Sequence, residues 1–136
     1  MTPTPNSNLP HIRVVAAEIE QNGEYLITQR RPEAALPLLW EFPGGRVQEG
    51  ESDSDALRRT IRHRLDVGVQ VGHRVLHVTH TYDKYALDMI VYRCALVGEP
   101  RAANVHQINW VRPDAFGQYP FPGADQQTVD ALLAGT

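Results

Sequence analysis

The chain has 136 residues, of which 42% are hydrophobic, and its 13 basic and 16 acidic residues leave a formal charge of -3. This length and apolar content suit one compact domain with a core of ordinary size. The small net charge favours neither nucleic acid nor an anionic membrane as a partner. No signal peptide and no apolar run of about 18 residues is visible, and Cys94 is the only cysteine. The expected compartment is therefore the cytoplasm.

Two segments are predicted along the chain: a flexible leader over residues 1–10 and a single domain over residues 11–136. The leader is rich in Pro, Asn, Ser and Thr and offers almost nothing to bury. Beyond it, the apolar runs Ile12–Ile19 and Tyr25–Thr28 flank Asn22-Gly23, a dipeptide typical of tight turns. This pattern predicts a first hairpin.

A helix is predicted after the Pro-Gly-Gly break at residues 43–45. Ser52 or Ser54 can cap its start, and residues 66–68 end the pattern. Apolar residues recur at every fourth position of the segment, at Leu57, Ile61 and Leu65. Residues four apart share one face of a helix, so this stripe should pack on the core.

The rest of the chain predicts a second hairpin, a short strand and a closing helix. The runs Gln70–Thr81 and Lys84–Val97 are strand-like and form the hairpin, Ile108–Val111 is the short strand, and Pro113 starts a helical turn. Ala124–Leu133 is the closing helix. This order of elements indicates an α+β fold or an α/β/α sandwich, and it leaves the topology open.

The segment Trp40–Ser52 and the helix after it resemble the signature of the Nudix hydrolase superfamily. That signature, the Nudix box, reads G, five residues, E, seven residues, then R-E-U-x-E-E-x-G-U, where U is aliphatic. The residues that match at the required spacings are Gly45, Glu51, Arg59 and Ile61. The resemblance implies a single Nudix domain over residues 11–136, a Nudix-type α/β/α sandwich with a mixed sheet and the box helix packed on one face.

In that family the Gly-rich loop approaches phosphates, and glutamates one helical turn apart hold a divalent cation, usually magnesium. Here the three glutamate positions of the R-E-U-x-E-E cluster carry Thr60, His63 and Arg64. The local formal charge changes by about +4 when these residues replace three carboxylates. At roughly 5 Å and an effective dielectric constant of about 20, one positive side chain repels a divalent cation by on the order of 6 kcal/mol. We therefore expect no metal ligand set and no cofactor.

Without a metal ion, other roles are expected for the charged residues of the box. By the resemblance, Glu51 and Arg59 support the box, so we expect a vestigial glutamate that forms an ion pair with Arg59. Arg64 places a positive charge where the cation would lie, which suggests that it binds a phosphate or diphosphate directly, beside Gly44 and Gly45. The alternative is that Arg64 is only a charge matched to the dipole at the end of its helix.

Beyond the box, the chain resembles the MutT and CTP-pyrophosphohydrolase branch of the family. The resemblance places Arg30 at a phosphate-contacting arginine and Asp125 at the residue that hydrogen-bonds the base. The alternative for Asp125 is an N-cap on the closing helix. In the loop before Trp110, Asn104 falls at the place of a glutamate that is a candidate general base in MutT.

Three functions remain open from the sequence. The first is a nucleotide or nucleoside diphosphate binder with impaired or absent hydrolysis, working without metal. The second is an active atypical pyrophosphohydrolase that uses magnesium or manganese through other carboxylates. The third is a Nudix-fold interaction module. The expected partner is a nucleotide or nucleoside diphosphate derivative, without membrane or nucleic acid, and the chain could act as a monomer or a homodimer.

Overall fold

The computed structural model describes residues 9–134, so most of the predicted leader over residues 1–10 lies outside the described part. Its last residue, Pro10, accepts a backbone hydrogen bond from Ala86 at 2.9 Å, which places it at the start of the fold. The elements follow in the order β1 (His11–Glu18), β2 (Glu20–Gln21), β3 (Glu24–Gln29), β4 (Trp40–Glu41), β5 (Gly44–Arg46), α1 (Asp53–Leu65), β6 (Gly68–Thr81), β7 (Ala86–Val97), β8 (Gln107–Val111), the 3₁₀-helix η2 (Pro113–Gln118) and α2 (Gly123–Ala134). None of the described helices is long and apolar enough to cross a membrane.

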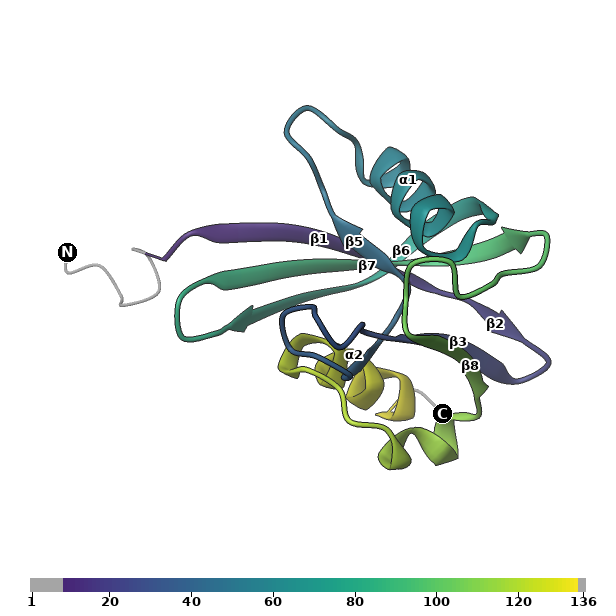
Figure 1. Ribbon diagram of the computed structural model, residues 1–136. Helices are drawn as coiled ribbons and strands as arrows, with labels where there is room; N and C mark the ends of the chain where they lie inside the picture. The colour runs from purple at the N-terminus through teal and green to yellow at the C-terminus, as the bar shows by residue number, and fades with distance from the viewer. Residues whose placement is uncertain (1–8, 135–136) are drawn as a thin grey trace.

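The strands form two sheets that lie between the two α-helices, with α1 on one side and α2 on the other (Figure 1). The larger sheet has the strand order β5-β1-β7-β6. It is mixed, because β1 runs parallel to β7, whereas β5 is antiparallel to β1 and β6 is antiparallel to β7. The smaller sheet joins β2, β3 and β4, and β8 pairs with β3. The predicted α+β sandwich with a mixed sheet and the box helix on one face is confirmed.

The first predicted hairpin is confirmed only at its tip. Asn22 and Gly23 both have positive φ, as a tight hairpin turn requires, and they join β2 to β3. The longer run β1, however, lies in the other sheet, between β5 and β7. Its residues 14–17 carry apolar side chains on both faces, and a strand in the middle of a sandwich buries both faces. The Asn22-Gly23 turn signal therefore does not reveal that β1 pairs in parallel with β7.

The box helix α1 forms as its sequence predicts. Ser52 is the N-cap, and its hydroxyl accepts a hydrogen bond from the backbone N–H of Asp55 at 3.1 Å. The stripe Leu57, Ile61 and Leu65 is fully buried. Asp66, which stands at the second glycine of the box pattern, has φ 51° and donates its backbone N–H to the carbonyl of Arg62. This left-handed residue ends the helix.

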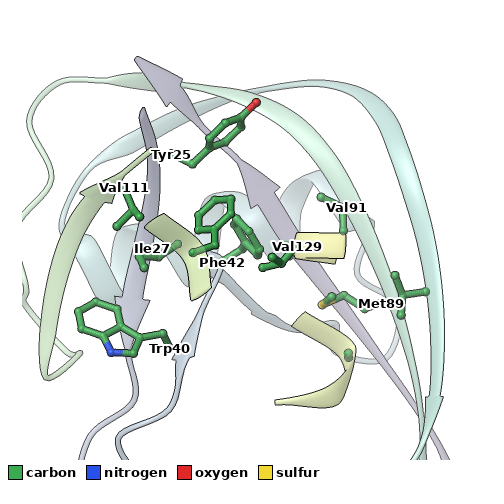
Figure 2. Close-up of a cluster of buried hydrophobic side chains, with 12 residues drawn as sticks. Tyr25, Ile27, Trp40, Phe42, Met89, Val91, Val111 and Val129 are labelled. Atoms are coloured by element: carbon green, nitrogen blue, oxygen red, sulfur yellow. The ribbon is translucent and has the colours of Figure 1, made fainter. Parts of the chain in front are cut away.

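Side chains from one strand alternate between two hydrophobic cores. Val15, Ala17 and Leu26 pack with α1 in one core, together with the buried Cys94. The second core lies on the α2 side, where Figure 2 shows the converging side chains Tyr25, Ile27, Trp40, Phe42, Met89, Val91, Val111 and Val129. The segment that leads into the Nudix box is thus anchored by aromatic packing, and this fixes the backbone of β4 and β5.

Candidate functional site

The turn from β4 to β5 brings Gly44 and Gly45 against β1 and α1. Gly44 has φ 156°, and a Cβ at this position would lie 2.0 Å from the carbonyl oxygen of Val15. A Cβ on Gly45 would lie 2.6 Å from Cγ2 of Thr60. Neither position has room for a side chain, so the glycine pair allows β5 to pack between β1 and the box helix.

The loop before α1 is fastened by the ion pair that the sequence predicts between Glu51 and Arg59. Arg59 donates to both carboxylate oxygens of Glu51, from Nε at 2.7 Å and from Nη2 at 2.9 Å. Arg59 also donates to the carbonyl of Arg46 at 2.8 Å, and the N–H of Gln48 donates to Glu51 at 3.0 Å. The guanidinium of Arg59 lowers the pKa of Glu51 to about 2. The predicted supporting ion pair is confirmed.

We expect Glu51→Gln to weaken the acid dependence of stability. The folded-state pKa is depressed, so the carboxylate stabilises the fold fully above its unfolded pKa of about 4.3, and this contribution is lost as the pH falls towards about 2. Urea unfolding midpoints measured across this window should fall less steeply with acid in Glu51→Gln than in the native protein. The exposed Glu49→Gln is the control. If the unfolding midpoints of the Glu51 variant and the native protein fall equally steeply with acid, the ion pair with Arg59 does not stabilise the fold.

A groove of about 420 Å³ runs along α1 and is called here the helix groove. Its lining residues are Arg46, Val47, Gln48, Glu49, Arg59, Thr60, His63 and Arg64. Thr60, His63 and Arg64 therefore share one surface, as their helical spacing indicates. Thr60 is buried and donates its hydroxyl to the carbonyl of Ala56 at 2.7 Å. Within residues 9–134, no group of three or more His, Cys, Asp or Glu side chains is arranged to hold a metal ion.

A second hollow of about 240 Å³, called here the inner cleft, adjoins the helix groove. The two share Arg46 and Arg64 as lining residues. Tyr82 and Tyr85, from the turn between β6 and β7, and the apolar side chains of Leu87 and Met89 line it as well. The inner cleft therefore offers aromatic and apolar walls next to a strongly basic groove.

Glu41 joins the two predicted phosphate-binding arginines at the boundary of these hollows. Arg30 Nη1 lies 3.0 Å from one carboxylate oxygen of Glu41, and Arg64 Nη1 lies 3.2 Å from the other. The side chain of Glu41 is only 15% exposed, against 24% for Arg30 and 32% for Arg64. Arg30 also donates from Nε to the carbonyl of Ala35. The structure thus brings Arg30 and Arg64 together around one carboxylate.

The sequence reasoning missed Glu41, although a signal was available. It stands between Trp40 and Phe42, both of which are buried in the second core. A charged residue inside such an apolar segment needs partners of opposite charge, because an isolated buried charge is strongly unfavourable. Nothing local in the sequence shows that these partners are Arg30 and Arg64.

Asp125 is buried in the first turn of α2 and also lines the inner cleft. Its Oδ1 accepts a hydrogen bond from the backbone N–H of Phe42 at 3.2 Å. Burial raises the pKa of Asp125 well above its ordinary value, and the nearby charge of Glu41 raises it further. Because α2 begins at Gly123, the interpretation of Asp125 as its N-cap is wrong: the side chain bonds another segment instead.

Asn104, placed at the candidate general base by the resemblance, lies at the C-terminal end of α1. Its side chain donates to the carbonyl of His63 at 2.7 Å, and its backbone N–H donates to the carbonyl of Arg64 at 3.0 Å. Asn104 therefore satisfies carbonyls that the helix end leaves unpaired. It is not among the residues that line either hollow.

Comparison with known proteins identifies the family of this chain. The family model of the NUDIX domain matches residues 14–131. The chain is 32% identical over 124 residues to the CTP pyrophosphohydrolase of Escherichia coli K12, covering 90% of this chain and 92% of that protein. It is 30% identical over 128 residues to the 8-oxo-dGTP diphosphatase of Haemophilus influenzae, again covering 90% and 92%.

A solved structure shows the same fold over almost the whole chain. The solution structure of the Escherichia coli ORF135 protein has a TM-score of 0.82 at 30% identity, and the match covers 96% of this chain and 94% of that chain. The likeness therefore extends well beyond the box segment over residues 40–65. The chain is a member of the Nudix family, in its MutT-like and CTP-pyrophosphohydrolase-like branch.

Proposed function

We propose that this protein binds a nucleoside diphosphate or triphosphate without a metal ion and that its hydrolytic activity is impaired or absent. The observation that carries the proposal is the pair of guanidinium groups, Arg30 and Arg64, that meet where the inner cleft joins the helix groove. Arginine donors arranged in this way recognise phosphate oxygens directly. Arg64 stands at a box position that the family gives to a carboxylate.

The residues of the helix groove do not fit magnesium. Thr60 turns its hydroxyl hydrogen to a helix carbonyl, and Arg64 brings a fixed positive charge. Glu51, the box glutamate that remains, is already occupied by Arg59 through two hydrogen bonds. Magnesium needs several oxygen ligands in octahedral geometry. We infer that the phosphate chain lies where this groove joins the inner cleft, against Arg64 and Arg30.

We propose that the inner cleft binds the nucleoside part of the ligand. Tyr82 and Tyr85 offer ring faces and edges for stacking, and Asp125 lies at the wall with one oxygen fixed by the N–H of Phe42. Its raised pKa favours a neutral carboxyl, which can donate a hydrogen bond to an acceptor atom of a base. Two relatives are named for CTP and for 8-oxo-dGTP, which supports a nucleotide ligand.

Nucleotide binding by the native protein should persist in EDTA and should weaken in Arg64→Ala. Hydrogen bonds to charged groups contribute about 1.5–3 kcal/mol, so the loss of Arg64 should weaken binding by about 10- to 100-fold. Calorimetric titration with CTP, 8-oxo-dGTP and ADP-ribose measures this. Arg62→Ala, an exposed arginine on the same helix, is the matched control. Absence of binding by any nucleotide in EDTA, with binding restored by magnesium, would rule out the metal-free site.

The second candidate is an active but atypical pyrophosphohydrolase that uses magnesium or manganese. Glu49 lines the helix groove, and the relatives are named as enzymes. Metal-dependent turnover that decreases in Glu49→Gln would favour this function. It would also show that carboxylates outside the R-E-U-x-E-E positions can hold the metal.

A further inference from the structure

Two basic side chains of the helix groove, those of Arg46 and His63, have no ion-pair or hydrogen-bond partner within residues 9–134. Both residues are exposed. Their backbones, by contrast, are fixed, because the carbonyl of Arg46 accepts from Arg59 at 2.8 Å and that of His63 accepts from Asn104 at 2.7 Å. The groove therefore presents donor groups that the protein itself does not use.

These two side chains extend the row of basic groups that begins in the inner cleft. Arg30 lines the inner cleft, Arg64 and Arg46 line both hollows, and His63 lines the helix groove. Arg30 and Arg64 already share the carboxylate of Glu41, so the positive charge that remains unshared is that of Arg46. An elongated anion that begins at the arginine pair would meet unused donors in the groove.

The charges of the helix groove favour an anion over a magnesium ion. Glu49 is the only acidic residue among those that line it. The charge of Arg59 is compensated by its two hydrogen bonds to Glu51. Arg46 and Arg64 thus face a single lining carboxylate, whereas magnesium needs several oxygen ligands and is repelled by guanidinium groups.

We propose that the helix groove holds the terminal phosphate of an uncomplexed nucleoside triphosphate, with Arg46 and His63 as its donors, and that magnesium weakens this binding. The inference rests on the proposed function and adds the chemical form of its ligand. Arg46 supplies a charged guanidinium, and His63 supplies a ring N–H, which even a neutral imidazole carries. A nucleoside diphosphate, whose two phosphates contact Arg30 and Arg64, leaves both of these donors unused.

The direction of the magnesium effect follows from charge. A magnesium ion bound to the triphosphate neutralises part of its negative charge and occupies phosphate oxygens that the arginines would otherwise contact. The complex also carries a divalent cation towards Arg46 and Arg64, and like charges repel. The free triphosphate should therefore bind more tightly than its magnesium complex. A groove lined by metal-holding carboxylates would show the opposite order.

Isothermal titration calorimetry with CDP and CTP, in EDTA and in excess magnesium, tests this inference. In EDTA, CTP should bind about tenfold more tightly than CDP, which is the lower end of what a hydrogen bond to a charged group contributes. Excess magnesium should weaken the binding of CTP by about tenfold. Potassium chloride at the same ionic strength is the control, because added salt also screens the charges.

The variants Arg46→Gln and His63→Ala identify the donors. Arg46→Gln should bring the affinity for CTP close to that for CDP, because it removes the charge that only the third phosphate uses. His63→Ala should weaken the binding of CTP severalfold and leave that of CDP unchanged. Arg58→Gln is the matched control, because Arg58 is an exposed arginine of α1 that pairs with Asp55 and lines neither hollow. The magnesium comparison uses the native protein, so it tests the inference even if a variant folds poorly.

The outcomes separate this inference from the proposed function. Equal affinities for CDP and CTP in EDTA, or tighter binding of CTP in magnesium, would overturn the inference while leaving a metal-free nucleotide site. An equal loss of CTP affinity in Arg58→Gln and Arg46→Gln would also overturn it, because the overall charge and not the groove would then select the triphosphate. Absence of binding by both nucleotides in EDTA would overturn the inference and the proposed function together.

Discussion

Replacing Thr60, His63 and Arg64 together with glutamate should give this protein magnesium-dependent hydrolysis of a nucleoside triphosphate. The three positions line one groove, and they are the glutamate positions of the box pattern. Glutamates at positions 63 and 64 lie three and four residues after the one at position 60, so they can meet it on one side of α1 and share a cation. Glu51 and Arg59 are already in place to support them.

The expected gain in magnesium affinity comes mainly from the change in charge. Removal of one guanidinium at roughly 5 Å from a divalent cation relieves on the order of 6 kcal/mol, which corresponds to about four orders of magnitude in magnesium affinity. Without magnesium, the new carboxylate at position 64 faces Glu41, and the variant should be less stable than the native protein. Thermal unfolding with and without magnesium, beside a phosphate-release assay, measures both effects.

The control for this restoration is the double substitution Arg58→Glu and Arg62→Glu. Both residues lie on the exposed side of the same helix, in ion pairs with Asp55 and Asp66. The control changes the helix charge in the same direction without adding groove ligands, and it should stay inactive. If the triple variant folds, binds magnesium and still hydrolyses no member of a nucleotide panel, the loss of the three glutamates is not what limits activity.

Gly44→Ala should remove a large part of the stability of the fold. A Cβ at this position would lie 2.0 Å from the carbonyl oxygen of Val15 and 2.8 Å from Cα of Ala16, and both are backbone atoms that cannot turn away. Overpacking costs about 1–3 kcal/mol, and an unsuitable φ adds about 1–3 kcal/mol. The sum is a large part of a total stability of about 5–15 kcal/mol. Chemical denaturation followed by tryptophan fluorescence measures this loss.

Two other glycines separate the steric effect from the backbone effect. Gly117 has open space where a Cβ would lie and no positive φ, so Gly117→Ala should leave the free energy of unfolding almost unchanged. Gly50 also has open space but φ 79°, so Gly50→Ala tests backbone strain alone and should cost about 1 kcal/mol. A loss in Gly44→Ala no larger than that in Gly50→Ala would show that β5 can move away from β1.

The features that the sequence predicts well are local. The spacing of Leu57, Ile61 and Leu65 predicts the helix and its buried face. The ion pair between Glu51 and Arg59 is expected from the resemblance to the Nudix box, and the structure shows it. The apolar stripe depends on residues within about two helical turns of each other, where periodicity determines position. The same periodicity correctly places Thr60, His63 and Arg64 in one groove.

The features that the sequence does not predict depend on distant segments. The partner of β1 is β7, more than sixty residues later, and a strand with two buried faces carries no signal for its neighbour. Glu41 meets Arg64, 23 residues later, and Asp125 bonds Phe42, 83 residues earlier. Such contacts are set by how the layers pack, so the arginine-bound carboxylate and the buried acid emerge only from the folded structure.

The most direct measurement is hydrolysis by the native protein itself, with magnesium or manganese and a panel that includes CTP, 8-oxo-dGTP and ADP-ribose. Since Thr60, His63 and Arg64 replace the metal-binding glutamates, we expect no metal-dependent turnover above background from a preparation that binds a nucleotide in EDTA. Turnover that persists through repurification and decreases in Glu51→Gln would contradict this. It would show that the groove holds a metal despite Arg64.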